Sequence, residues 1–286
     1  MVIIMWNGKK KAVTFSYDDG VEQDRRLIAL FNKYGMKATF NQNSGIQTRA
    51  DTFTQGNIVV HRMNQKDMRE LYKGHEIASH TLTHANLKGL DEETVYNEIS
   101  TDIRNLEAFY EQKIAGFVFP FGTYDESAFR ILKECGIQYA RTSGDTHGFA
   151  LQSDLLRFKP SFHHADADIM SGIDRFLNMD TDEPQLLYIW GHSYEFDRDN
   201  NWDVIEEFCK MIGGREDIWY ATNAEVCHYL MAVKQVHTSV DEKLLFNGSG
   251  QDIYLIRNGE NILLRPGELQ RIHSPESHGK LRKIVL

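Results

Sequence analysis

The sequence lacks any apolar run long enough to cross a bilayer. A membrane-spanning helix needs about 20 consecutive apolar residues, and no stretch of this 286-residue chain approaches that length. The chain starts MVIIMWNGKKK, with its basic cluster after the apolar residues, whereas a secretory signal peptide has the opposite order. We therefore expect no membrane span and, for the sequence as given, a cytoplasmic location.

Cysteine is scarce, and basic residues are outnumbered by acidic ones. Cys135, Cys209 and Cys227 are odd in number and widely spaced, so they form neither a CxxC metal motif nor an even disulfide framework. We interpret them as small buried thiols. The formal net charge of −9 at pH 7 argues against nucleic acid or an anionic membrane as the main partner.

The chain does contain a regular alternation of short apolar strands and amphipathic helices. We predict helices at 24–34, 64–72, 91–112 and 125–134, and strands at 11–17, 37–41, 75–79, 116–119, 137–142, 185–190 and 218–222. Alternation of this length implies a parallel sheet, either open or closed. Seven or eight strands favour the closed form, so we predict an α/β fold built on a TIM-barrel-like (β/α) barrel of about seven strands.

The pattern changes near Val236. Residues 242–286 hold three short apolar runs separated by Asn247-Gly248, Asn258-Gly259 and Pro266-Gly267. Asn-Gly steps are typical of β-hairpin turns, but a segment this short cannot hold a core of its own. We therefore predict a barrel domain at 1–235 and a small β-rich appendage at 236–286 that packs on the barrel.

Chemically active residue types collect where the predicted strands end, which is where functional groups gather in parallel α/β folds. Asp18 and Asp19 end the first strand, and the sequence HTLTH (residues 80–84) follows the third. Further candidates lie in or after later strands: Pro120-Phe121-Gly122, Arg141 and His192.

The HTLTH sequence places His80 and His84 at a spacing that can present two imidazoles to one ion. On its own this spacing is as typical of two surface or core histidines. With a strand-end aspartate it gives two histidines, one carboxylate and open positions, as in catalytic metal sites. One aspartate then joins the metal shell, and its neighbour stays free to accept a proton from water. Zn²⁺ suits such a shell best, with Co²⁺, Ni²⁺ and Fe²⁺ as alternatives.

His192 and Arg141 each have a catalytic and a structural interpretation. His192 is either a general acid that protonates a leaving group or a buried histidine in a network. Arg141 either steers the base carboxylate or forms an ordinary salt bridge. Asp145 is a candidate to orient His192.

Candidate substrate contacts flank the same positions. Asn41 and Asn43 follow the second strand, where their alternative role is loop capping. Tyr194 opens a loop of aromatic and acidic residues, which is either a sugar-binding wall or a solvated surface. We predict substrate contacts at Asn41, Asn43, Pro120, Trp190 and Tyr194.

Four motifs in order resemble the polysaccharide deacetylases of carbohydrate esterase family four, which share the chitooligosaccharide-deacetylase homology domain. TFSYDDG resembles the first motif of that family and HTLTH the second, while FVFPFG resembles the third and LYIWGH the fifth. The resemblance runs from about residue 10 to residue 230. Each motif is modest alone, but the ordered set is highly specific.

The resemblance implies a distorted, incomplete (β/α) barrel and a divalent metal, commonly zinc. It implies that Asp18 is the general base, that His192 is the general acid, and that the backbone N–H of Phe121 helps to bind the oxyanion. It implies a metal shell made by Asp19, His80 and His84.

One motif departs from the family. The third motif often carries an arginine two residues before the proline, and Val118 stands at that position here. We therefore expect Arg141 to take the place of that arginine beside Asp18. The fourth motif is matched only loosely, by residues 141–147.

The sequence thus predicts a metal-dependent hydrolase that removes acetyl groups from an N-acetylated, or less readily an O-acetylated, carbohydrate. A first alternative is an amidohydrolase on the same scaffold that acts on a small non-sugar amide or cyclic imide. A second alternative is a non-catalytic carbohydrate-binding protein. The predicted partner is an acetylated carbohydrate or a small amide, and not a nucleic acid.

Overall fold

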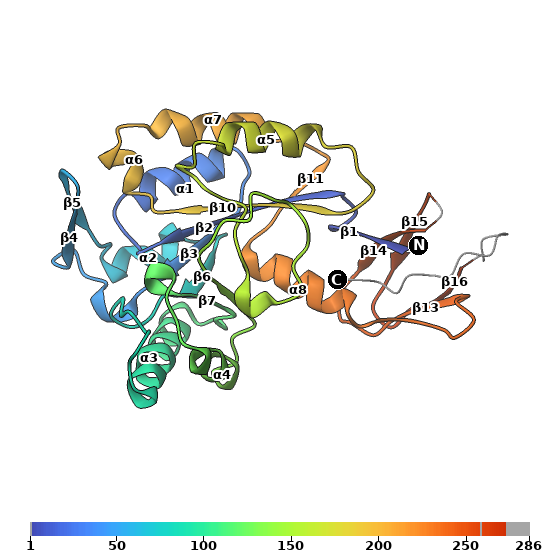
Figure 1. Cartoon of the computed structure of the whole chain (residues 1–286), viewed down its shortest axis with the longest axis horizontal. Coiled ribbons are helices and arrows are strands. Elements are labelled where there is room, and N and C mark those ends of the chain that lie inside the picture. Colours follow the sequence, from blue (N-terminus) through green and yellow to red (C-terminus); the bar gives the residue numbers. More distant parts are fainter. Residues whose placement is uncertain (1, 258, 273–286) are drawn as a thin grey trace.

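The computed structural model describes residues 2–257 and 259–272, and its centre is a parallel β-sheet (Figure 1). Seven strands run in the order β8-β7-β6-β3-β2-β10-β9, and β11 also pairs with β2. Their bounds are β2 (Lys11–Asp18), β3 (Thr39–Gln42), β6 (Glu76–Ser79), β7 (Gly116–Val118), β8 (Tyr139–Arg141), β9 (Phe162–His163), β10 (Gln185–Gly191) and β11 (Ile218–Tyr220).

Strand β2 is the centre of this sheet. One of its edges pairs with β10 from Lys11 to Tyr17. The other edge is shared, because β11 pairs with residues 11–13 and β3 with residues 16–18. Asp18, at the carboxyl end of β2, therefore lies well inside the sheet rather than at its edge.

A short irregular segment bridges the two ends of the curled sheet. Phe158 forms a parallel bridge with Arg141 in β8. A few residues later, the Ser161 N–H donates to the Tyr188 carbonyl of β10 over 2.7 Å. The predicted barrel-like α/β fold is confirmed as a curled half-barrel, and the predicted strands are all present, with the two-residue β9 in addition.

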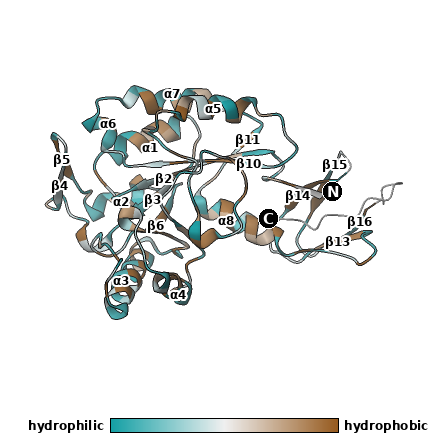
Figure 2. Ribbon diagram, viewed as in Figure 1, coloured by the Kyte–Doolittle hydropathy of each residue, from teal (hydrophilic) through white to brown (hydrophobic). Residues whose placement is uncertain are grey.

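The helices lie around the sheet, most of them on its outside. They are α1 (Asp24–Lys33), α2 (Gln65–Leu71), α3 (Glu92–Tyr110), α4 (Glu126–Glu134), α5 (Ile169–Asn178), α6 (Glu195–Arg198), α7 (Trp202–Ile212) and α8 (Asn223–Val233). Figure 2 shows hydrophobic and hydrophilic residues side by side on α5 and α7, as expected for helices with one buried face. None of the described helices has the length and apolar character needed to cross a membrane.

The two faces of β2 have different partners. Val13, Phe15 and Tyr17 belong to the hydrophobic core beneath the outer helices. Thr14 and Ser16 alternate with them and make polar contacts, to Asn223 at the start of α8 and to the Asn41 amide of β3, respectively. Since side chains alternate across a strand, this polar row leads along the inner face of the barrel to Asp18.

Helix α8 closes the amino-terminal end of the barrel. It begins with a capping box between Thr222 and Glu225. The Asn223 amide donates to the Tyr188 hydroxyl over 2.6 Å, and the Ala224 N–H donates to the Glu76 carboxylate over 2.8 Å. The first turn of α8 is therefore tied to β6 and β10.

Six further strands form two small antiparallel sheets beside α8 (Figure 1). One sheet has the order β1-β14-β15 and the other β12-β13-β16. Their bounds are β1 (Val2–Met5), β12 (Val236–Thr238), β13 (Leu244–Asn247), β14 (Ile253–Arg257), β15 (Glu260–Leu264) and β16 (Leu269–Arg271). The amino-terminal strand β1 thus pairs with the appendage, although the division at residue 236 assigns it to the barrel; that division stays a prediction.

The cysteines of the chain are free thiols. Cys209 and Cys227 are buried, as predicted, whereas Cys135 is only half-buried. Cys209 packs with the outer helices and Cys227 with the appendage.

Replacing Thr222 by Ala tests how much the capped start of α8 contributes. The hydroxyl accepts a hydrogen bond from the Glu225 N–H, and its loss leaves that donor unpaired. We expect the free energy of unfolding to fall by about 1 kcal/mol in chemical denaturation. A Thr222→Ser variant keeps the hydroxyl and should stay close to wild type, and equal losses in both variants would contradict the cap.

Candidate active site

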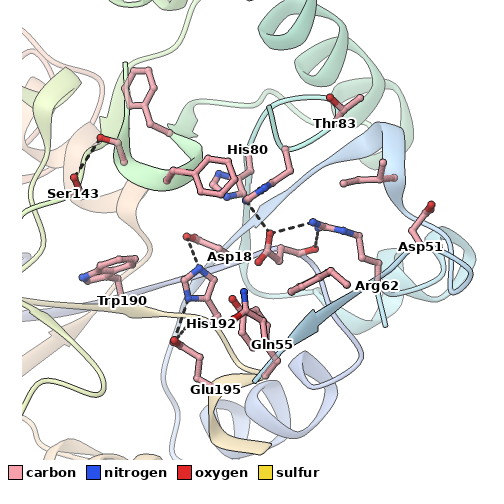
Figure 3. A pocket seen from close by; sticks show the side chains of 18 of the residues that line it. Asp18, Asp51, Gln55, Arg62, His80, Thr83, Ser143, Trp190, His192 and Glu195 are labelled. Carbon is pink, nitrogen blue, oxygen red and sulfur yellow. Dashed lines mark hydrogen bonds and ion pairs between the residues drawn. The ribbon is translucent and has the colours of Figure 1, made fainter. Parts of the chain in front are cut away.

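The loops at the carboxyl ends of the parallel strands enclose a cavity of about 760 Å³. Its walls include Asp18, Asp19, His80, His84 and His192. These residues come from motifs that lie far apart in the sequence. The volume lies within the range of small-molecule and cofactor sites, about 300–1,000 Å³. Figure 3 shows His192 between Asp18 and Glu195 on one side of this cavity, with Arg62 and Asp51 on the other.

Asp18 is held by two donors. The Arg141 guanidinium donates to its Oδ2, and the Asn41 amide donates to its Oδ1 over 2.7 Å. Burial would raise the pKa of Asp18, but Arg141, together with His80 and His192, lowers it to about 2. Asp18 is therefore ionised at neutral pH, and the pair that we expected between Arg141 and Asp18 is present.

Asp19 is paired with a different arginine, Arg62. Its Oδ1 lies 3.4 Å from Arg62 Nη2 and 3.4 Å from His84 Nε2. Burial would raise the pKa of Asp19, but Arg62 and the nearby histidines lower it. Asp19 has a φ of 83°, in the left-handed region, so the backbone leaves the extended conformation of β2 at this residue.

Asp19, His80 and His84 form a group that can hold a metal ion, since their ligand atoms lie within 4.8 Å of one another. His80 Nδ1 lies 2.8 Å from the Val118 carbonyl, which can only accept, so Nδ1 carries the proton and the Nε2 lone pair is free. Burial lowers the pKa of His80 to about 4 and also lowers the pKa of His84. Neutral imidazoles, one of them donating to a carbonyl, are the state that metal ligation requires.

Phe121 lies at the rim of the cavity, on the turn after β7. Its side chain is 66% exposed, and its ring meets the His84 ring edge-on at 4.8 Å between centroids. Its φ is 58°, which is uncommon for an aromatic residue and typical of functional sites. The oxyanion role of its N–H stays a prediction.

His192 contacts both a base and a carboxylate partner. His192 Nε2 lies 3.7 Å from Asp18 Oδ2, and its Nδ1 lies 3.2 Å from Glu195 Oε2. Burial would lower the pKa of His192, but the hydrogen bond to Glu195 and the charges of Asp18 and Asp19 raise it to about 9. His192 is therefore protonated at neutral pH, as a general acid must be.

Two further histidines lie beside Glu195. His163 Nε2 and His164 Nε2 lie 3.1 and 3.3 Å from the same Oε2 atom. The sequence analysis did not single out Glu195, although its position three residues after His192, on the first turn of α6, is a local signal that could have found it.

Asp145 does not orient His192, so that prediction is wrong. Its Oδ1 accepts the Trp190 indole N–H over 2.7 Å, and its Oδ2 accepts the His163 N–H over 2.7 Å. The Arg141 guanidinium lies over the Trp190 ring, with its Cζ atom 4.5 Å from the ring centroid. Asp145 thus fixes Trp190, which lines the cavity and supports Arg141.

The predicted substrate contacts divide into two groups. Trp190 and Tyr194 line the cavity, whereas Asn41, Asn43 and Pro120 are buried and do not. Asn41 binds Asp18, as described above. The Asn43 amide donates to the His80 and Thr81 carbonyls, so it holds the histidine segment. Asn43 thus fits the loop-capping alternative, whereas Asn41 supports the Asp18 carboxylate.

A hairpin forms a wall that the sequence analysis did not predict. Strands β4 (Thr52–Gln55) and β5 (Ile58–His61) pair only with each other among the described strands. Residues 51–55 line the cavity, and Val60 packs with Val21 and Tyr194. Arg62 follows β5 directly, which is how its side chain reaches Asp19.

A family comparison covers the part of the chain that holds the first three of the four motifs. Residues 6–140 match the family model for polysaccharide deacetylase. A curated Bacillus subtilis (strain 168) protein, the putative polysaccharide deacetylase YxkH, is 25% identical over 138 residues. That match covers 47% of this chain and 45% of the relative, so it spans less than half of either protein.

A solved structure shows the same fold over most of the chain. A putative polysaccharide deacetylase from Mycobacterium smegmatis has a TM-score of 0.61 at 18% identity, covering 95% of this chain and 98% of the other. A pseudoenzyme of carbohydrate esterase family 4 from Bacillus anthracis has a TM-score of 0.45 at 15% identity, covering 77% of this chain and 66% of the other. The match to the family model and the curated relative confirm the resemblance to polysaccharide deacetylases.

Replacing Arg141 by Met should impair Asp18. The variant keeps much of the side-chain volume but loses the guanidinium that fixes Oδ2, so the carboxylate loses its orientation and its pKa rises. We expect kcat/KM to fall about 10²-fold, with the acidic limb of the pH–rate profile moving to higher pH. Full activity with an unchanged profile would show that Arg141 is only a structural salt bridge.

Replacing Glu195 by Gln should shift the basic limb of the profile. In the folded protein the pKa of His192 is about 9, above its ordinary value of 6.5. Protonated His192 therefore contributes fully to folding stability below pH 6.5, and this contribution to stability is lost as pH rises through about 9. Without the Glu195 charge, we expect the basic limb to move down by about one to two pH units. Asp145→Asn is the matched control, because Asp145 contacts the Trp190 indole and the His163 backbone and makes no hydrogen bond to His192. An equal shift there would contradict the assignment.

Proposed function

Since residues 6–140 carry the polysaccharide deacetylase signature, we propose that this protein is a metal-dependent hydrolase that removes acetyl groups from a carbohydrate. The observation that carries the proposal is the placement of Asp18 and His192 beside the Asp19–His80–His84 group in one cavity. An ionised carboxylate and a protonated imidazole lie 3.7 Å apart there. An acid and a base in those protonation states are what amide hydrolysis requires.

A divalent ion held by Asp19, His80 and His84 would polarise the acetyl carbonyl and lower the pKa of water. Zn²⁺ is our first choice for two imidazoles and one carboxylate, while Co²⁺, Ni²⁺ and Fe²⁺ remain alternatives. His80 contributes a preset tautomer, because the Val118 carbonyl fixes its proton on Nδ1.

The protein's own residues supply the proton transfers. Asp18, oriented by Arg141 and Asn41, accepts the proton of the attacking water as the new C–O bond forms. The Phe121 N–H donates to the oxygen on which negative charge develops. His192 then gives its Nε2 proton to the departing amine as the C–N bond breaks, or to an alcohol in the case of an O-acetyl group.

An N-acetylated sugar fits the character of the walls. Phe121 and Trp190 offer aromatic surface on one side, and Thr52, Thr54 and Gln55 offer polar groups on the hairpin side. Aromatic faces with a few flanking polar groups are the usual lining of such sites. The cavity volume also suits a small amide or cyclic imide, which we keep as the second candidate.

A screen of acetylated substrates tests the proposal directly. We expect acetate release from N-acetylated sugar oligomers, abolished by a chelator and restored by Zn²⁺. Asp18→Asn should retain the metal and lose acetate release by about 10²- to 10⁴-fold, because only the base is removed. Turnover of a cyclic amide alone would favour the second candidate, and saccharide binding without any turnover would favour a non-catalytic binding protein.

A further inference from the structure

Asp19 is paired with an arginine that belongs to none of the four motifs. Arg62 Nη2 lies 3.4 Å from Asp19 Oδ1, and Arg62 Nη1 donates to the Asp19 carbonyl over 2.5 Å. Arg62 is 5% exposed, so solvent screens its charge only weakly. Oδ1 is also the atom that lies nearest to His84 Nε2, at 3.4 Å. The guanidinium thus contacts the oxygen that faces the histidine ligands.

The guanidinium is fixed in this position. Its Nη1 also donates to Asn43 Oδ1 over 2.8 Å, and its Cζ atom lies 5.2 Å from the Phe53 ring centroid. The Arg62 backbone bridges Val21, two residues after Asp19. A side chain held at both ends cannot swing away without breaking several contacts, so Arg62 stays beside any ion that Asp19 binds.

We propose that Arg62 is a built-in counter-cation for Asp19, which keeps the metal-free site folded and makes the bound ion exchangeable. Two buried carboxylates without partners would be strongly destabilising. Arg141 compensates Asp18 and Arg62 compensates Asp19, so the metal-free site is already balanced. A fixed positive charge beside Oδ1 then opposes the binding of a dication. This inference rests on the proposed metal site.

The two effects of Arg62 have opposite signs, which makes them separable from a merely structural role. Removing the charge destabilises the metal-free protein, because Asp19 loses its partner. The same change removes the repulsion and frees Oδ1, so the ion binds more tightly. A residue that only positions the ligands would, when removed, lower both stability and metal affinity.

The test compares Arg62→Met with Arg62→Lys, which keeps the charge. Metal-free Tm is measured by thermal unfolding, and the Zn²⁺ Kd by competition with a chromophoric chelator. For Arg62→Met we expect a lower metal-free Tm and a Kd lowered at least about tenfold. For Arg62→Lys we expect a Kd within about threefold of wild type. Arg69→Met, at an exposed arginine paired with Glu111, should change neither quantity.

A Kd for Arg62→Met that is unchanged or higher overturns the proposal. If Arg62→Met does not fold without metal, Arg62→Gln keeps a donor but no charge, and the same lowering of the Kd is expected from it. A wild-type protein that releases acetate and binds Zn²⁺, but whose Arg62 variants bind it more weakly, overturns this inference alone. A wild-type protein that binds no divalent ion overturns both this inference and the proposed function.

Discussion

The arrangement of the site depends on burying two consecutive carboxylates at the end of the central strand. Asp18 and Asp19 are only 2% and 3% exposed. Charges that leave water need partners at hydrogen-bond distance, and the neighbouring residues of β2 have none to offer. The partners come from far along the chain, Arg141 from β8 and Arg62 from the segment after β5. The site therefore requires both the curl of the sheet and the β4–β5 hairpin. Together they bring those two arginines to opposite sides of one strand end.

Backbone strain is concentrated at the same place. Asp19, Thr81, His84 and Phe121 all have positive φ values, between 58° and 83°. Such conformations persist only where the surroundings over-determine them, and the surroundings here do so. The Asn43 amide binds the His80 and Thr81 carbonyls, while Asp102 of α3 accepts from the Ser79 hydroxyl over 2.6 Å and the Ser44 N–H over 2.6 Å. Asn43, which looked like a substrate contact, is better understood as part of the frame that holds strained ligands in position.

The sequence could predict those features that a pattern within a few residues specifies. The strands and the motif histidines are local, since periodicity and spacing within a few residues specify them. The Arg141–Asp18 pair could be predicted because Val118 stands where the family's third motif often carries an arginine. A later strand offered Arg141 as its replacement. Arg62, the Asp145–Trp190 bond and the β1–β14 pairing join segments that no local pattern connects. Their residue types were visible, but a guanidinium finds its partner only after the chain has folded, so spacing alone could not identify the contact.

The partners of Glu195 and of Asp18 explain why base and acid keep separate protonation states. Burial would raise the pKa of Glu195, but its hydrogen bonds with His163 and His192 lower it. Glu195 therefore remains a carboxylate, and its hydrogen bond and charge raise the pKa of His192 to about 9. On the opposite side of His192, Arg141 is the main group that lowers the pKa of Asp18 to about 2. An arginine and a glutamate, each outside the reacting pair, thus separate the two pKa values by several units. Between them lies the pH range in which Asp18 can accept a proton while His192 still has one to give.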